Sequence, residues 1–290
     1  MRVMTNLLNR IPASWIRAAS AVRGSSASIK SATDWLPDLL RNREGRIQRG
    51  LGRGLRFNGG SSAVGFLLGT HDLELQYAMS KLLKPGMIVY DLGANVGFTA
   101  ILAARQVAPS GRVICFEPLA VNAERIHHNA ALNGFGFVEV RQIAVGATDG
   151  EAEFLLSESP TWGRLAQSGP APKQSGVTVV PVRSLDSLVE HEGLPSPQLI
   201  KMDVEGGEAA ALLGAKRLLA TSRPVMIVEL HHTYHAVMSA LEGLDFVVRP
   251  LVRGEVASLD DEFQILAYPR ERGDVEVICS DVAAGRMVFT

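Results

Sequence analysis

The chain has 290 residues, of which 47% are hydrophobic and 20% are charged, and its formal net charge is −1. This composition is typical of a globular protein, and the balanced charge gives no indication of nucleic-acid binding. Two cysteines, Cys115 and Cys279, are too few for a disulfide framework or a metal cage, so we expect a reducing, cytoplasmic compartment. The sequence contains no apolar run of about 18 residues, so we predict no transmembrane helix.

The first segment of the chain is basic. Between Met1 and Thr33 the sequence has five basic residues and no acidic one. The stretch LLNRIPASWIRAASAVRG is compatible with an amphipathic helix that touches a membrane surface or a partner. The alternative is a loosely docked extension, because chain termini are often poorly ordered. We divide the chain into this extension at 1–50, a main domain at 51–270 and a C-terminal tail at 271–290.

From about residue 84, predicted strands and helices alternate. Short apolar runs that stop at turn residues predict strands, and longer segments with helical periodicity predict helices. Strands are expected at 86–93, 112–118, 137–146, 198–203 and 225–230, and helices at 98–107, 120–134, 208–220 and 234–243. This alternation indicates βαβ units and a parallel sheet. Two final strands are expected at 245–251 and 263–269, the last pair antiparallel.

Residues 151–185 interrupt the alternation. The stretches EAEFLL and VTVVPV predict two strands joined by a polar loop, so a hairpin insertion is expected between the third and fourth strands. A loop this long without regular structure is usually functional or disordered. We expect residues 157–176 to cover a site at the edge of the sheet, with Trp162 either contacting a ligand or packing the hairpin onto the core.

The sequence VYDLGANVG ends the first strand and contains Asp91, Gly93, Asn95 and Gly97. A glycine-rich turn after the first strand of an α/β sheet brings backbone close to a ligand. A dinucleotide-binding turn reads G-x-G-x-x-G, but here Asn95 replaces the glycine that lets backbone approach a pyrophosphate. An acidic residue before the turn suits a ligand with a cationic group. The alternative is a tight turn that uses Gly and Asn only for its geometry.

The second strand ends at Glu117. An acidic side chain there can accept hydrogen bonds from both hydroxyls of a ribose, or can simply precede the next helix. With the turn, it indicates a ligand that has a ribose and a positive charge but no pyrophosphate. S-adenosylmethionine (SAM) has this chemistry, which favours a SAM-binding protein. An NAD-linked oxidoreductase of the same fold is the less favoured alternative. The adenine is expected near the end of the third strand, at Gln142 and Ala144.

Five stretches give the chain a resemblance to the FkbM family of SAM-dependent methyltransferases. They are GMIVYDLGANVGFTA, VICFEP, VRSLDSL, LIKMDVEGGEAAALLGAKRLL and PVMIVELHH, in the family's order over roughly 65–235. Gly207 stands where the family usually has alanine, and the first 50 residues match nothing in the family. The resemblance implies a Rossmann-like class I methyltransferase fold, a mainly parallel seven-stranded sheet with its last strand antiparallel. It also implies methylation of a hydroxyl on a sugar, glycan or polyketide-type small molecule.

Three carboxylates, those of Asp203, Glu205 and Glu208, follow the fourth strand. The tip of this strand faces the first strand across the crevice where open α/β sheets bind ligands. The carboxylates can bind the methionine amine, accept a substrate proton or hold a divalent metal, or Glu205 and Glu208 can simply favour a helix N-terminus. We expect Asp203 and Glu205 to contact the cofactor and Asp203 to take part in catalysis. We assign no metal from the sequence, and we expect activity without added metal.

Two histidines, His231 and His232, follow the fifth strand. The pKa of histidine suits a base for a hydroxyl at neutral pH, so both are candidate catalytic residues, with Glu229 as a possible orienting group. The alternative is a polar loop without catalytic function. HHTYH lacks the H-E-x-x-H spacing of a zinc protease. A protein of this fold that binds SAM without turnover is the alternative to a methyltransferase.

Overall fold

A computed structural model describes residues 44–60, 65–157, 163–170 and 174–289. Most of the expected N-terminal extension, and Trp162, lie outside the described residues. Within these ranges, no helix has both the length and the apolar character needed to span a membrane.

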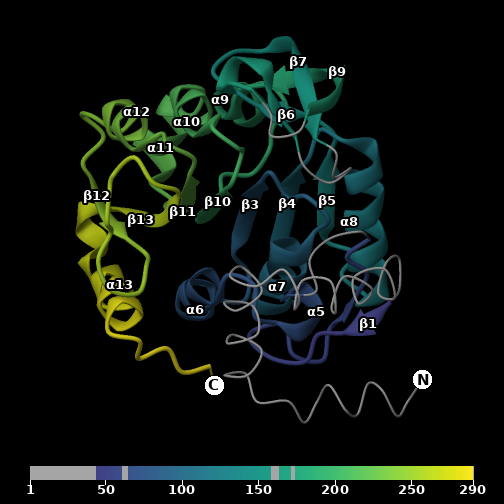
Figure 1. The fold of residues 1–290 in the computed structure, drawn as a ribbon, viewed down its shortest axis with the longest axis vertical. Coiled ribbons are helices and arrows are strands. Elements are labelled where there is room, and N and C mark those ends of the chain that lie inside the picture. Colours follow the sequence, from purple (N-terminus) through teal and green to yellow (C-terminus); the bar gives the residue numbers. More distant parts are fainter. Residues whose placement is uncertain (1–43, 61–64, 158–162, 171–173, 290) are drawn as a thin grey trace, which may run out of the picture.

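Seven strands form the main sheet in the order β12-β13-β11-β10-β3-β4-β5 (Figure 1). β13 runs antiparallel to both its neighbours and the other neighbouring pairs are parallel, which confirms the expected Rossmann-like sheet with a reversed last strand. The strand order reverses between β3 and β10, which creates a switch point at their carboxyl ends. The strands are β3 (Ile88–Leu92), β4 (Arg112–Phe116), β5 (Val138–Arg141), β10 (Leu199–Met202), β11 (Val225–Leu230), β12 (Phe246–Pro250) and β13 (Phe263–Pro269).

Helices cover both faces of this sheet, because its strands are apolar on both sides. In β3, Val89 packs into one hydrophobic core and Tyr90 and Leu92 pack into the other. The Val89 face is covered by α6 (Leu73–Leu82), α7 (Phe98–Val107), α8 (Ala120–Leu132) and α13 (Glu276–Ala283). The opposite face is covered by α9 (Leu185–Glu190), α10 (Glu208–Leu213), α11 (Lys216–Ser222) and α12 (Tyr234–Ala240).

Two expected elements are each divided in the structure. The third strand, expected over 137–146, ends at Arg141, and the chain then bends into β6 (Ala144–Val145), which belongs to another sheet. The helix expected over 208–220 breaks at Gly214, where a Cβ would lie 2.1 Å from the carbonyl oxygen of Gly146. Asp186 caps the second half, because its carboxylate accepts hydrogen bonds from the backbone N–H of Arg217 and Leu218.

The insertion between β5 and β10 is a four-stranded sheet in the order β6-β9-β7-β8. Its long antiparallel pair, β7 (Gly150–Ser157) and β9 (Gln174–Arg183), corresponds to the two strands expected from the sequence. β6 and β8 (Gly163–Leu165) extend this pair, and η1 (Ala166–Ser168) follows β8. In Figure 1 the sheet stands above the ends of β3, β4 and β5.

Both ends of the described chain contribute to the core on the α7 side. Near the N-terminal end, β1 (Gly45–Arg46) pairs with β2 (Arg56–Phe57), and Ile47 and Phe57 are buried. Short helix α5 (Gly65–Leu68) and η2 (Arg270–Val275) complete the described elements. Within the expected C-terminal tail, α13 packs against α6 and buries Ile278 and Val282. The tail up to α13 is therefore part of the folded unit.

We predict that Ile278→Ala lowers the free energy of unfolding by about 2–4 kcal/mol, because it opens a cavity between α13 and α6. The neighbouring Val277 is 59% exposed and provides the matched control. Val277→Ala is expected to change stability by less than about 0.5 kcal/mol. Urea unfolding of both variants measures the difference. Equal stabilities would show that α13 does not stabilise the core.

Candidate active site

One cleft opens where the carboxyl ends of β3, β4 and β10 meet the insertion sheet. Some of the segments that line it were predicted from the sequence to form a site, and others were not. The lining residues are Gly93, Asn95, Phe116, Glu117, Pro118, Leu119, Asn122, Ala144, Val145, Phe154, Gly163, Leu165, Asp203, Val204, Glu205 and Gly207.

The turn after β3 has three residues in the left-handed region. They are Gly93 (φ 72°), Asn95 (φ 51°) and Gly97 (φ 82°), which explains why this sequence alternates Gly and Asn. At Gly93 a Cβ would lie 1.8 Å from the carbonyl oxygen of Asp203, so the turn can pack against the β10 tip only without a side chain. Gly93 and Asn95 line the cleft, whereas Gly97 faces Ile126 of α8. The sequence prediction of a ligand contact at Gly97 is therefore not supported by this geometry.

Asp91 lies beneath the turn rather than in the cleft. Its side chain is 1% exposed, and the strand register places it beside Lys201 of β10, whose Nζ lies 3.4 Å from Oδ1 of Asp91. Within the described residues, neither carboxylate oxygen of Asp91 makes a hydrogen bond of normal geometry. Burial raises the pKa of Asp91 and the Lys201 ammonium opposes this shift. Direct contact between Asp91 and a cationic ligand, as the sequence suggested, would require the turn to open.

Lys201 also donates to the carbonyl oxygen of Gly93 at 3.2 Å and lies 3.5 Å from Oδ2 of Asp203. Burial by itself lowers the pKa of an ammonium, but the carboxylates of Asp91 and Asp203 outweigh it and raise the pKa of Lys201. Lys201 therefore holds a fixed positive charge between the β3 and β10 tips.

Glu117 reaches the cleft from the end of β4. Its carboxylate accepts hydrogen bonds from the backbone N–H of Asn95 (2.9 Å) and Leu119 (3.0 Å), and from Nδ2 of Asn122 (3.2 Å). Burial raises the pKa of Glu117 to about 7, against the effect of these three donors. Beside it, Oδ1 of Asn122 is buried and has no hydrogen-bond partner in the described part of the chain. The cleft thus presents a carboxylate and an unpaired amide oxygen side by side.

The far wall of the cleft comes from β6 and the insertion sheet. Ala144 lines it as expected, whereas the side chain of Gln142 is exposed at the bend between β5 and β6 and does not line it. Phe154 of β7 and Leu165 of β8 supply apolar surface that the sequence did not predict as part of a site.

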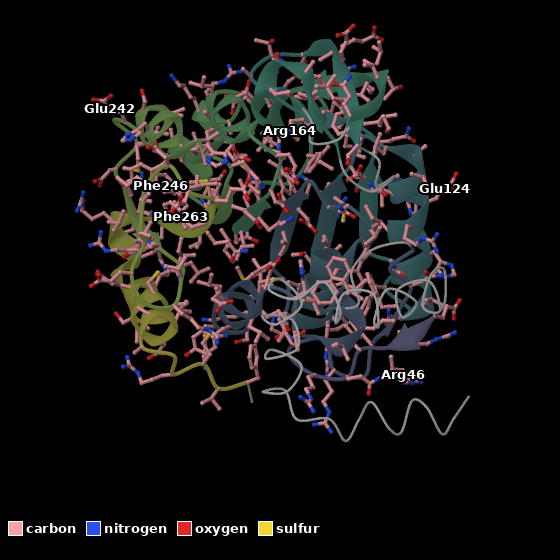
Figure 2. The ribbon with its side chains drawn as sticks, viewed as in Figure 1. Arg46, Glu124, Arg164, Glu242, Phe246 and Phe263 are labelled. Atoms are coloured by element: carbon pink, nitrogen blue, oxygen red, sulfur yellow. The ribbon has the colours of Figure 1, made fainter. Side chains whose placement is uncertain are left out.

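The segment after β10 turns sharply and carries three carboxylates. Glu205 has a left-handed backbone (φ 53°), and the carboxylates of Asp203 and Glu205 belong to cleft-lining residues. Arg164 of β8, labelled in Figure 2 near the insertion, lies 3.2 Å from Oε2 of Glu205 and so joins the insertion to the β10 tip. Burial raises the pKa of Glu205, and His231 and Arg164 oppose this shift.

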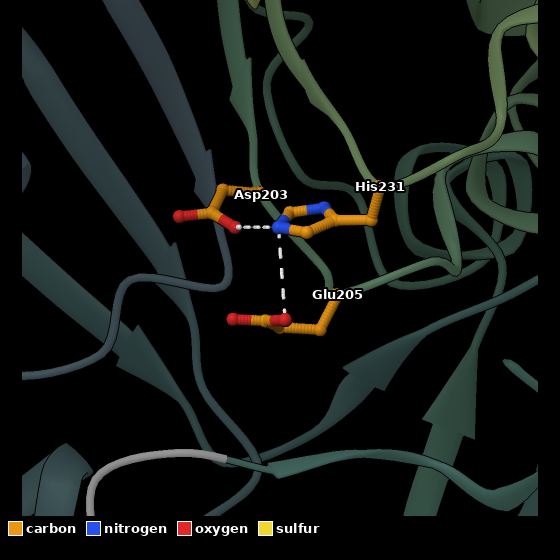
Figure 3. A group of neighbouring side chains, drawn as sticks. All are labelled: Asp203, Glu205 and His231. Carbon is orange, nitrogen blue, oxygen red and sulfur yellow. Dashed lines mark ion pairs between the residues drawn. The ribbon is translucent and has the colours of Figure 1, made fainter. Parts of the chain in front are cut away.

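Glu208 is completely buried and orients His231. One oxygen of Glu208 accepts from the backbone N–H of Gly206 (2.9 Å) and from Nδ1 of His231 (3.1 Å), and the other accepts from Oγ1 of Thr233 (2.8 Å). As a result Nε2 of His231 points towards Asp203 and Glu205 (Figure 3). Burial opposes protonation of His231, but Glu208, Asp203 and Glu205 outweigh it and raise the pKa of His231 to about 9.

The other side chains predicted beside the fifth strand do not join this group. His232 points away from the cleft, because its backbone is left-handed (φ 60°), and its ring contacts the carbonyl of Asp260 and Oε1 of Glu262. Its side chain is 67% exposed. Glu229 accepts from Nε2 of Gln264, whereas Glu208 is the carboxylate that orients His231.

Three polar residues near the site escaped the sequence prediction, namely Lys201, Asn122 and Arg164. The sequence could have indicated Lys201, because a charged residue inside a buried strand needs a charged partner. No sequence pattern indicated Arg164 or Asn122, because only the packing of the insertion and of α8 brings them to the cleft.

The chain is similar to known proteins in sequence and in structure. The family model described as the methyltransferase FkbM domain matches residues 91–248. The chain is 28% identical over 176 residues to the 2-O-methyltransferase NoeI of Sinorhizobium fredii, an alignment that covers 56% of this chain and 71% of that protein. It is 28% identical over 144 residues to the hexuronic acid methyltransferase AglP of Haloferax volcanii, covering 50% of this chain and 56% of that protein.

Among solved structures, the methyltransferase FkbM from Methylobacillus flagellatus KT aligns with a TM-score of 0.44 and 15% identity, over 71% of this chain and 55% of that one. A SAM-dependent O-methyltransferase from Thermotoga maritima aligns with a TM-score of 0.42 and 14% identity, over 68% and 65% of the two chains. Both scores lie below 0.5, so the likeness is too weak to place individual residues.

We predict that Lys201→Met lowers the free energy of unfolding by about 3–5 kcal/mol, because it leaves Asp91 buried without its counter-charge. The double variant Asp91→Asn with Lys201→Met should recover much of this loss. Urea unfolding of the three proteins provides the measurement.

The control for this prediction is Arg270→Met, which removes an exposed pair with Asp245 (2.7 Å). It should cost no more than about 1 kcal/mol. If Lys201→Met costs as little as this control, the buried pair does not hold the two strand tips together.

Proposed function

The chain belongs to the FkbM methyltransferase family, and from this premise we propose that it is a SAM-dependent O-methyltransferase that acts on a hydroxyl of a sugar or glycan. One observation carries the proposal. A single cleft joins the turn after β3, Glu117 at the end of β4 and the carboxylates after β10. These are the carboxyl ends of strands on both sides of the switch point, where open α/β sheets bind ligands.

The cleft fits the adenosine part of SAM. The carboxylate of Glu117 has more lone pairs than its three donors use, so it can accept ribose hydroxyls as well. The unpaired Oδ1 of Asn122 can accept a hydrogen bond from a hydroxyl or amino group of the nucleoside. Leu119, Ala144 and Leu165 supply an apolar surface for the adenine. The methionine end would then lie towards Gly93 and Asp203.

The carboxylates of Asp203 and Glu205 line the cleft, where they can approach the positive charge of SAM. The nearby cations are Lys201, Arg164 and, below its pKa of about 9, His231. When bound, SAM supplies the methyl group: its carbon–sulfur bond breaks, the electron pair stays on sulfur, and S-adenosylhomocysteine is left.

The chain itself must orient the acceptor and receive its proton. As the acceptor oxygen forms its bond to carbon, the hydroxyl loses a proton. Glu117 is assigned to the ribose, so Asp203 and Glu205 are the lining carboxylates left for this proton. Nε2 of His231 lies 3.8 Å from Oδ1 of Asp203 and 3.6 Å from Oε2 of Glu205, so its charge can favour the ionised form of both. Most of the catalytic effect is expected from positioning.

The acceptor class rests on the relatives and on the insertion. One relative is named for methylation at a 2-oxygen and another for methylation of a hexuronic acid. In this chain, the insertion places Arg164 beside the carboxylates at the cleft. A guanidinium and carboxylates together suit a polyhydroxyl ligand, because hydroxyls both donate and accept hydrogen bonds.

The reaction is tested by incubating the purified chain with methyl-labelled SAM and a panel of neutral sugars and hexuronic acids. We expect label in a methyl ether of at least one sugar, detected by NMR, together with stoichiometric S-adenosylhomocysteine. Label in a methyl ester or an N-methyl product would contradict O-methylation of a hydroxyl. The same assay with boiled protein gives the background.

We predict that Glu117→Ala weakens SAM binding at pH 8 by about 1.5–3 kcal/mol, or roughly 10- to 150-fold, measured by calorimetry. In the parent protein, SAM affinity should fall up to about tenfold between pH 8 and pH 6. Glu117 has a pKa of about 7, and its protonation removes the charged acceptor. This pH dependence should be absent from the variant.

The control is Glu124→Ala, which removes a carboxylate that points outward from α8 (Figure 2). It should leave SAM affinity and its pH dependence unchanged. Thermal melting of both variants checks that each is folded. Parent-like SAM affinity in a folded Glu117→Ala protein would place the ribose elsewhere.

A further inference from the structure

The side chains of Asp203, Glu205 and His231 converge on one point beside the cleft (Figure 3). Each contributes one potential ligand atom, and all three atoms lie within 4.8 Å of one another. Nε2 of His231 is 3.8 Å from Oδ1 of Asp203 and 3.6 Å from Oε2 of Glu205. The side chains come from two strand ends, Asp203 and Glu205 after β10 and His231 after β11.

The imidazole of His231 is fixed in position, yet its Nε2 has no hydrogen-bond partner among the described residues. The His231 side chain is only 7% exposed, and its Nδ1 is engaged by the completely buried Glu208. Its Nε2 has no hydrogen bond within the described residues, and its nearest carboxylate oxygens lie beyond hydrogen-bond distance. Binding of a metal ion would displace the Nε2 proton of the charged ring, and with Nδ1 still donating to Glu208 the Nε2 lone pair faces the two carboxylates.

We propose that Asp203, Glu205 and His231 bind a divalent cation. One nitrogen and two carboxylate oxygens at these separations can surround a metal ion at about 2.0–2.2 Å after small movements of the half-buried carboxylate ends. The hydrogen bond from His231 to Glu208 is the outer interaction that usually fixes a histidine ligand. We choose Mn²⁺ as the probe. Mg²⁺ and Ca²⁺ prefer oxygen ligands, whereas Mn²⁺ accepts a mixture of oxygen and nitrogen ligands.

This set differs from the one that the sequence suggested. Glu208 was a candidate ligand, but its oxygens are used by Gly206, Thr233 and His231. His231 takes its place as the third ligand. The expectation of activity without added metal counted only the three carboxylates as ligands. Because His231 adds a nitrogen ligand, that expectation no longer follows from the ligand set.

The surrounding cations define how tightly an ion can bind. Lys201 contacts Oδ2 of Asp203, which leaves Oδ1 free to face the ion. Arg164 contacts Oε2 of Glu205, the same oxygen that faces His231. A metal ion must therefore compete with Arg164 but not directly with Lys201.

Three protein ligands leave coordination positions open on the ion. Asp203 and Glu205 line the cleft, so those positions can face it, and neighbouring hydroxyls of a sugar can fill them. A coordinated hydroxyl loses its proton more readily, and the oxygen of Glu205 that does not face the ion can receive that proton. This role for the ion rests on the proposed function, whereas binding of the ion does not.

The test is titration of the full chain with Mn²⁺, without SAM or acceptor, followed by the electron paramagnetic resonance signal of free Mn²⁺. We expect one site per chain. Glu205→Gln, Asp203→Asn and His231→Gln should each weaken binding at least tenfold. His232→Gln, which alters the exposed neighbouring histidine, should bind like the parent. Arg164→Met should bind several-fold more tightly, because it removes the competing cation.

The proposal is overturned if the parent does not bind Mn²⁺, or if folded Glu205→Gln and His231→Gln bind it like the parent. Thermal melting shows which variants are folded. Glu205→Gln and Arg164→Met keep the test decisive if the buried His231 variant unfolds, since they predict opposite changes. Mn²⁺ binding without any methyl transfer would leave this site standing and count only against the proposed reaction.

Discussion

The ion pair between Asp91 and Lys201 is the constraint on which the site depends. The register of β3 and β10 places the two side chains next to each other on the same face, inside the sheet. Burying either charge alone would be costly, so the two strand tips must stay together. Lys201 also contacts the carbonyl oxygen of Gly93 and the carboxylate of Asp203, so one ammonium fixes the turn after β3 relative to the segment after β10.

From this fixed point, environment separates the carboxylates into different roles. Asp91 is buried beneath the turn and serves to balance charge. Glu117 is held by three N–H donors and faces the cleft with a pKa of about 7. Glu208 is buried and orients His231, whereas Asp203 and Glu205 stay accessible at the cleft. Residues of one chemical type thus become a buried counter-charge, a carboxylate held at the cleft by N–H donors, an orienting group and an accessible pair.

The insertion closes the site from a different direction. Its strands are far from β10 in the sequence, yet β8 brings Arg164 to Glu205, and Phe154 and Leu165 line the cleft. The edge of the parallel sheet supplies the polar residues of the cleft, and the insertion supplies one wall of it. This division agrees with the general use of a rigid sheet for positioning and of added segments for specificity.

The sequence by itself determined the seven-stranded sheet, the turn after β3 and the placing of Glu117, Ala144, Asp203 and Glu205 at one edge. Periodicity and strand-end residues are local properties, and the carboxyl ends of parallel strands necessarily meet. Tertiary structure decided the rest. It buried Asp91 beside Lys201, turned Gln142 to solvent, made Gly97 a packing residue, and separated His231 from His232 through one left-handed residue. Two adjacent histidines are equivalent in sequence, and the Glu208 carboxylate, buried at the start of α10, holds the one that faces the cleft. Side-chain direction and charge pairing depend on contacts between distant segments, which no local pattern encodes.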